Sequence, residues 1–125
     1  MKKNFEVIFW QDENGYSEAQ EYIMSLKDKS LKSKDARVKL NKIATYIELL
    51  SVHGTELGEP YIKYITNCEF PIYELRPLRD RFFFFYKKEN KYIILNHFTK
   101  FTQKTPKREI EKAIKLLKDS LERNL

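Results

Sequence analysis

Four short runs with the composition of β-strands follow one another between residues 61 and 98, and they leave few folds open to this chain. The runs are rich in β-branched and aromatic residues and cover Tyr61–Ile65, Pro71–Arg76, Arg81–Tyr86 and Tyr92–Phe98. Only short turns, Pro77–Asp80 and Lys88–Lys91, separate the last three runs. Because connections of this length join antiparallel neighbours, the sequence predicts an antiparallel sheet in the second half of the chain.

An opening strand and a pair of helices are predicted before this sheet. Residues 4–10 are mostly apolar and include β-branched and aromatic members, which favours a strand. Ser17 has the capping position of a short helix that reaches about residue 26. A longer helix begins near residue 30 or 33, and Gly54 ends it, because glycine readily adopts the left-handed backbone of a helix C-terminus. One face of the longer helix is apolar through Ala36, Leu40, Ile43, Ala44, Ile47 and Leu50.

A last helix completes the predicted fold. Thr105 is expected to cap it and Pro106 to be its first residue. Its apolar stripe consists of Ile110, Ala113, Ile114, Leu117 and Leu121. Residues 1–125 are therefore expected to form a single α+β domain, in which an N-terminal helical pair and a C-terminal helix pack on an antiparallel sheet that has room for a mixed edge. The aromatic run Phe82–Phe85 favours a strand covered on both faces over a surface for base stacking.

Basic residues are concentrated in one third of the chain. The sequence has 24 Lys and Arg against 18 Asp and Glu, a net charge of +6. Residues 76–108 carry ten basic and two acidic residues, whereas residues 1–75 are net negative and residues 109–125 are balanced. Lysines that served only solubility would be spread along the chain. The concentration therefore indicates a polyanionic partner such as a nucleic acid.

Two arginines lie at the mouth of the predicted hairpin between the second and third of these strands. Strand alternation puts Arg76 on the same face as Glu74, and pairing of the two strands brings Arg81 close to Arg76. Two guanidiniums repel each other unless an anion lies between them, and their forked donors suit a phosphate. A second interpretation stays open, in which Arg76 forms a structural ion pair with Glu74 or another carboxylate.

The segment between the last strand and the last helix gathers further polar groups. It brings His97, Lys100 and Lys104 to one edge of the sheet, beside the free amide groups of a helix start. An imidazole exchanges protons near neutral pH, and a lysine becomes a base only where neighbouring positive charge lowers its pKa. These three residues, with Arg76 and Arg81, are the candidate catalytic residues. Candidate RNA contacts are Lys63, Arg79, Tyr86 and Lys107.

Two strings carry a family resemblance. YELRPLRDRFFFFY and ILNHFTKFTQKTPKREIEKAIKLLKD closely resemble the HigB-like, phage-derived branch of the RelE/ParE toxin superfamily, and the order of elements in the first half agrees. That family usually shows two adjacent lysines before Thr-Gln-Lys-Thr-Pro, whereas this chain reads Lys100-Phe101. The resemblance implies a RelE-like fold and the toxin of a type II toxin–antitoxin system. It also implies cleavage of mRNA, usually on the ribosome, and restraint by a helix-turn-helix, HigA-like antitoxin.

The residues are compatible with metal-independent cleavage. RNA supplies its own nucleophile, the 2′-hydroxyl, so the protein must add a base, positive charge for the phosphorane and an acid for the leaving oxygen. Two histidines and one cysteine are scattered without ligand spacing, so no metal or other cofactor is predicted.

The sequence is also compared with three functions other than that of a nuclease. A non-catalytic RNA- or ribosome-binding module would share the basic segment. A DNA-binding regulator is disfavoured because no helix-turn-helix pattern is present, so DNA is expected only through the antitoxin. A protein–protein adaptor would not explain the basic segment.

The cysteine and the apolar runs bear on where the protein works. Cys68 has no partner for an internal disulfide, and it is expected to be at least partly buried. The longest apolar run has five residues, too few for a membrane span or a signal-peptide core. A cytoplasmic protein is therefore expected.

Overall fold

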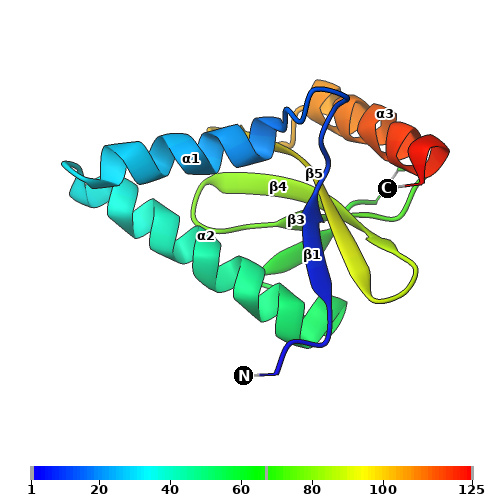
Figure 1. Ribbon diagram of the computed structural model, residues 1–125, viewed down its shortest axis with the longest axis horizontal. Coiled ribbons are helices and arrows are strands. Elements are labelled where there is room, and N and C mark those ends of the chain that lie inside the picture. Colours follow the sequence, from blue (N-terminus) through cyan, green and yellow to red (C-terminus); the bar gives the residue numbers. More distant parts are fainter. Residues whose placement is uncertain (1, 67, 125) are drawn as a thin grey trace.

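A computed structural model describes residues 2–66 and 68–124, and it contains every strand and helix predicted above (Figure 1). The element order is also the predicted one, with one short 3₁₀ helix added after the second helix. The elements are β1 (Glu6–Phe9), α1 (Glu18–Ser30), α2 (Lys34–His53), η1 (Gly54–Leu57), β2 (Ile62–Tyr64), β3 (Ile72–Leu75), β4 (Asp80–Lys87), β5 (Lys91–Thr99) and α3 (Lys107–Arg123).

The five strands form one mixed sheet in the order β1-β5-β4-β3-β2. The last four strands in the sequence pair antiparallel, and the two predicted tight turns join β3 to β4 and β4 to β5. Strand β1 lies at the edge and runs parallel to β5, with Val7 opposite Tyr92. The α+β class and the antiparallel sheet are confirmed, and β1 supplies a parallel edge.

Helices cover both faces of the sheet. The α1–α2 pair packs on one face around Leu26, Ile43 and Leu50, and α3 packs on the other through Ala113 and Leu117 (Figure 1). The aromatic residues of β4 serve the two cores alternately, since Phe82 and Phe84 face α1 and α2 while Phe83 and Phe85 face α3. This alternation confirms the prediction of a strand covered on both faces. Among the described residues, no helix combines the length and apolar character needed to cross a membrane.

The helix ends follow local chemistry, with one correction. The hydroxyls of Ser17 and Ser33 accept hydrogen bonds from the first turns of α1 and α2, and Gly54 ends α2 with a φ of 63°. Thr105 does not cap α3, because the helix begins only at Lys107, after an extended Pro106. The Thr105 hydroxyl instead donates to Glu74 Oε2 at 3.5 Å, so it ties the loop to the sheet.

A β-bulge in β5 decides which way the residues after it point. Phe83 pairs with Asn96 and Phe84 pairs with Ile94, so Leu95 is an extra residue on β5. Because side chains alternate along a strand, one extra residue reverses the alternation beyond it. His97 therefore lies beside Tyr22 of α1, and Phe98 joins the core under α3.

Candidate functional site

Five cationic side chains line one concave pocket of about 500 Å³ beside the loop that leads into α3. They come from β2, from the β3–β4 hairpin and from the end of β5, so only the folded sheet brings them together. We call this site the basic pocket; it is lined by Lys63, Arg76, Arg79, Arg81 and Lys100, together with Phe101, Thr102 and Gln103. All five cations are residues that the sequence singled out.

The backbone of the β3–β4 turn fixes the Arg81 guanidinium. Its Nη1 donates to the carbonyl oxygens of Leu78 at 2.7 Å and Asp80 at 3.0 Å. The Asp80 amide closes the turn on Pro77 O at 3.0 Å. Leu78 has a φ of 58°, a left-handed conformation that leucine seldom adopts. A strained turn thus presents a pre-positioned guanidinium to the pocket.

One buried carboxylate lies between the two hairpin arginines. Glu74 is fully buried, and its Oε1 is 3.3 Å from Arg76 Nε and 3.6 Å from Arg81 Nε. Arg76 also approaches the exposed Glu59 at 3.7 Å. The structure therefore has the ion pair of Arg76 with Glu74 and the closeness of Arg76 to Arg81 at the same time. Glu74 holds both guanidiniums, and its single negative charge leaves the five-cation pocket strongly positive.

The geometry of this carboxylate leaves donors unused. Glu74 Oε1, Arg76 Nε and Arg81 Nε are buried, and none of them has a well-formed hydrogen bond within the described residues. Buried donors of this kind are costly to leave unpaired. The two Nε atoms face the buried Glu74 and not the pocket, so an incoming anion would have to bind the other donors of the two guanidiniums.

Lys100 lies at the point where the loop meets the hairpin turn. Its backbone N–H donates to Arg79 O at 2.8 Å. Burial lowers the pKa of the Lys100 ammonium; Arg81, Arg76 and Lys63 lower it further, and Glu74 partly opposes them. Burial likewise lowers the pKa of Arg81, which Glu74 partly offsets. An arginine stays cationic in proteins, so Arg81 can serve only as a positive charge, whereas the lowered pKa of Lys100 favours its neutral form relative to an ordinary lysine.

His97 lies outside the basic pocket, on the opposite face of the sheet. Its ring stacks on Tyr22 with centroids 3.6 Å apart, and its Nε2 lies 2.9 Å from Asp80 Oδ1. Thr99 also donates to Asp80 Oδ1, at 3.4 Å. Burial raises the pKa of Tyr22 and the neighbouring Asp80 raises it further. His97 is thus a buried member of a polar cluster beneath α1.

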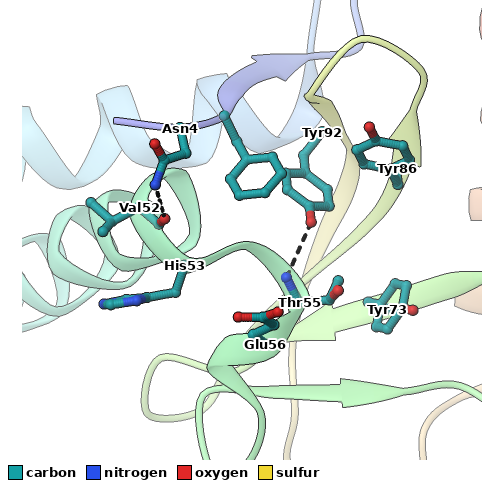
Figure 2. A pocket seen from close by; sticks show the side chains of 9 residues that line it. Asn4, Val52, His53, Thr55, Glu56, Tyr73, Tyr86 and Tyr92 are labelled. Carbon is teal, nitrogen blue, oxygen red and sulfur yellow. Dashed lines mark hydrogen bonds between the residues drawn. The ribbon is translucent and has the colours of Figure 1, made fainter. Parts of the chain in front are cut away.

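Three other predicted residues also lie away from the pocket lining. Tyr86 is five residues beyond Arg81 on β4, roughly 17 Å along the strand. Figure 2 shows it in a second pocket, where it lies with Tyr73 and Tyr92 near the end of α2. In that pocket Tyr92 Oη accepts from Thr55 N at 3.1 Å. Lys104 and Lys107 are exposed, the first in the loop and the second at the start of α3.

Some features of the pocket were not foreseen. The sequence pointed to Glu74 as a partner of Arg76 alone, and the pairing of Lys63 with Glu74 across β2 and β3 shows how close all these charges lie. Phe101, Thr102 and Gln103 line the pocket although none was a predicted site residue. The signal for them was their place in the polar loop beside Lys100. Within the described ranges, no cluster of three or more His, Cys, Asp or Glu side chains is arranged to hold a metal ion.

Comparison with known proteins gives one match. The family model described as "Phage derived protein Gp49-like (DUF891)" matches residues 29–118, which is most of the chain and includes every residue of the basic pocket. No curated protein matches the sequence. The matched family is a family of RelE/ParE-like toxins. The chain therefore belongs to the phage-derived Gp49-like family of RelE/ParE-like toxins.

Proposed function

We propose that this protein is a HigB-like toxin of a type II toxin–antitoxin system that cleaves mRNA on the ribosome without a metal. The observation that carries the proposal is the basic pocket, in which Arg76 and Arg81 are held side by side on a rigid turn. Membership of a RelE/ParE-like toxin family supports it. Positive charge fixed in advance around one point stabilises a developing phosphorane more effectively than mobile side chains do.

The proposed reaction uses the nucleophile already present in RNA. The 2′-oxygen attacks the adjacent phosphorus, the bond from phosphorus to the 5′-oxygen breaks, and a 2′,3′-cyclic phosphate and a 5′-hydroxyl result. Arg76 and Arg81 bind the phosphoryl oxygens, whose negative charge grows as the phosphorane forms. Lys63 and Arg79, which also line the pocket, hold the neighbouring backbone.

Proton transfer in this proposal belongs to the loop after β5. Neutral Lys100 takes the proton from the 2′-hydroxyl, since Lys100 lines the pocket and its pKa is lowered there. The 5′-oxygen leaves with a proton from water, because Lys104 belongs to the same loop but does not line the basic pocket. His97 was a sequence candidate for this step, but it lies under α1 on the other face of the sheet. In the proposed mechanism, His97 therefore takes no part in proton transfer.

The partners follow from the same proposal. The substrate is mRNA in the ribosomal decoding site, where the strand is single and its phosphates are accessible. The inhibitor is a helix-turn-helix, HigA-like antitoxin, and contact with DNA occurs only through that antitoxin. Lys107 and Tyr86 are left as candidate contacts with the ribosome, because both are exposed but lie outside the basic pocket.

Expression of the chain in growing cells tests the proposal. Wild-type protein is expected to arrest growth and to produce mRNA breaks in phase with codons, and the adjacent reading frame that encodes the antitoxin is expected to relieve both. Arg81→Ala is expected to lower cleavage by at least about 100-fold, as the loss of a transition-state donor does. Breaks should be mapped from 5′-hydroxyl ends.

Arg108→Ala is the matched control, because Arg108 is 87% exposed, belongs to the same basic segment and does not line the pocket. It should cleave like the wild type. Thermal unfolding of both variants separates lost chemistry from lost folding. If the protein binds ribosomes but produces no mRNA breaks, it is a non-catalytic binding module and not a nuclease. Cleavage retained by folded Arg81→Ala would remove the hairpin from the mechanism.

A further inference from the structure

We propose that the groove next to the basic pocket is a subsite for one unpaired nucleobase of the RNA, with Phe101 as its stacking surface. The inference rests on the proposed function, since the base belongs to the strand whose phosphate lies in the basic pocket. The groove has a volume of about 750 Å³ and runs between the β3–β4 turn and the α1–α2 pair. We call it the base groove, and its apolar walls are Tyr22, Leu26, Ala36, Leu78 and Phe101.

Phe101 is a large aromatic residue exposed in the polar loop after β5. Its side chain is 79% exposed, although it is one of the largest apolar side chains in the chain. It lines the base groove and the basic pocket at once, so one ring stands at the boundary between an apolar slot and a phosphate site. Proteins that bind single-stranded RNA use exposed aromatic rings of this kind as platforms for bases.

The far wall of the base groove is rigid. Tyr22 is clamped against His97, and Asp80, which also lines the groove, is bound by His97 Nε2 and the Thr99 hydroxyl. Leu78 is 48% exposed and projects from the strained turn. A planar base thus meets a preformed slot with apolar sides, and Asp80 and Thr99 are among the residues that line it. A preformed slot costs little ordering on binding.

Charge favours a nucleotide over an apolar peptide as the occupant. Arg79 lines both cavities, and Lys29 and Lys39 lie on the helix side of the groove, although Asp35 pairs with Lys39 at 3.1 Å. A nucleotide has an uncharged, flat base joined to an anionic phosphate. The structure matches this with an apolar slot that continues into a five-cation pocket. An apolar peptide side chain would gain nothing from the adjoining cations.

Binding of a short oligonucleotide tests the inference. The probe is a 2′-O-methyl oligoribonucleotide, which lacks the free 2′-hydroxyl and cannot be cleaved, and a matched series has each position in turn made abasic. For the wild type, one abasic position should weaken binding by roughly 5-fold to 100-fold, the usual effect of losing one stacked base. Phe101→Ala should bind weakly and lose this dependence, whereas Phe101→Trp should keep it. Leu31→Ala, which removes an 82% exposed side chain outside both cavities, should behave as the wild type.

The salt dependence of binding distinguishes the two cavities. Phe101→Ala should leave the slope of log K against log salt unchanged, because stacking releases no counterions, whereas Arg81→Ala should reduce the slope by about one. If Phe101→Ala binds every probe like the wild type while Arg81→Ala binds weakly, the base groove does not bind a nucleobase, and the role of the basic pocket in RNA binding is unaffected. If neither variant changes binding, the proposed function fails as well. A changed slope for Phe101→Ala would also overturn the inference, because the ring would then act through the cations.

Discussion

Glu74 offers the sharpest single test of how the basic pocket is held together. Glu74→Gln removes the charge between Arg76 and Arg81, but it preserves the shape of the side chain and an acceptor for Thr105. At 3.3 and 3.6 Å, each ion pair has a gross attraction of about 5 kcal/mol at an effective dielectric constant of about 20. Removal of the charge also returns the desolvation cost of the carboxylate, several kcal/mol, so the net loss is much smaller than the sum.

The exposed fractions of the Arg76 and Arg81 side chains determine how much folding free energy Glu74→Gln loses. The side chain of Arg76 is 24% exposed and regains water when its partner is lost, whereas Arg81, at 11%, remains buried with its charge unpaired. Loss of one partner of a buried ion pair costs about 3–5 kcal/mol, and the access of Arg76 to water moves the expected value to about 3 kcal/mol. For a domain of this length the Tm should fall by about 10 °C.

Thermal unfolding followed by circular dichroism measures this effect. Glu59→Gln is the matched control, because Glu59 approaches Arg76 at 3.7 Å but is 69% exposed. An exposed pair contributes about 0.5 kcal/mol, so the Tm of Glu59→Gln should lie within about 2 °C of the wild type. If the Tm of Glu74→Gln equals that of the wild type or of Glu59→Gln, Glu74 does not stabilise the fold by pairing with both arginines.

Inorganic phosphate provides a second measurement on the same variant. If Glu74 occupies donors that a substrate phosphate also uses, its loss makes the pocket a stronger anion site. Millimolar phosphate should therefore raise the Tm of Glu74→Gln more than that of the wild type, with chloride at equal ionic strength as reference. Tenfold tighter binding corresponds to about 1.4 kcal/mol of extra stabilisation near saturation. Equal gains in the two proteins would show that the carboxylate and phosphate do not share the guanidiniums.

Two further predictions separate the roles of Lys100 and His97. Lys100→Met should abolish cleavage yet raise the Tm at pH 7 by a degree or two. The reason is that folding lowers the pKa of Lys100, so the charged ammonium destabilises the folded state at every pH below that lowered pKa. The gain should fade as the pH approaches the ordinary lysine value of 10.5, and a gain that grows with pH would contradict the sign. His97→Gln should lower stability by about 1–3 kcal/mol, because the buried Asp80 loses its partner at 2.9 Å. Its cleavage should keep the wild-type pH dependence, and the loss in His97→Gln of an ionisation that the wild-type rate profile shows would return proton transfer to His97.

The sequence was sufficient for features that local chemistry decides. The cap at Ser17 and the helix end at Gly54 follow from the hydrogen bonds and backbone angles that these residues favour, and the structure selects Ser33 from the two starts that the sequence allowed for α2. The two tight turns required antiparallel pairing, and that pairing brought Arg76 and Arg81 together. Thr105 was wrong as a cap because α3 begins only at Lys107, and its hydroxyl donates instead to Glu74, a residue 31 positions away. A contact at that separation leaves no local pattern.

His97 shows why the candidate site could be predicted only in part. In an unbroken strand, His97 would share a face with Ile93 and Leu95, which is the face of Arg81 and the basic pocket. The extra residue Leu95 reverses that alternation, and the ring points to α1 instead. Nothing in the string Ile-Leu-Asn-His marks a bulge, because the bulge arises from the register of β5 against β4. Lys63, Arg76 and Arg81 escaped this error, since the β2–β3 and β3–β4 registers are regular.

The same register explains why a phosphate site and an apolar slot adjoin. Asp80 and Arg81 are successive residues of β4, so their side chains lie on opposite faces of the sheet, one in the His97 cluster and one in the basic pocket. Both are tied to the turn, Asp80 through its amide to Pro77 O and Arg81 through Nη1 to Leu78 O. Arg79, at the apex, lines the cavities on both sides. A change that loosens Asp80 must therefore shift the turn that orients Arg81, so the buried cluster under α1 supports the basic pocket across the thickness of the sheet.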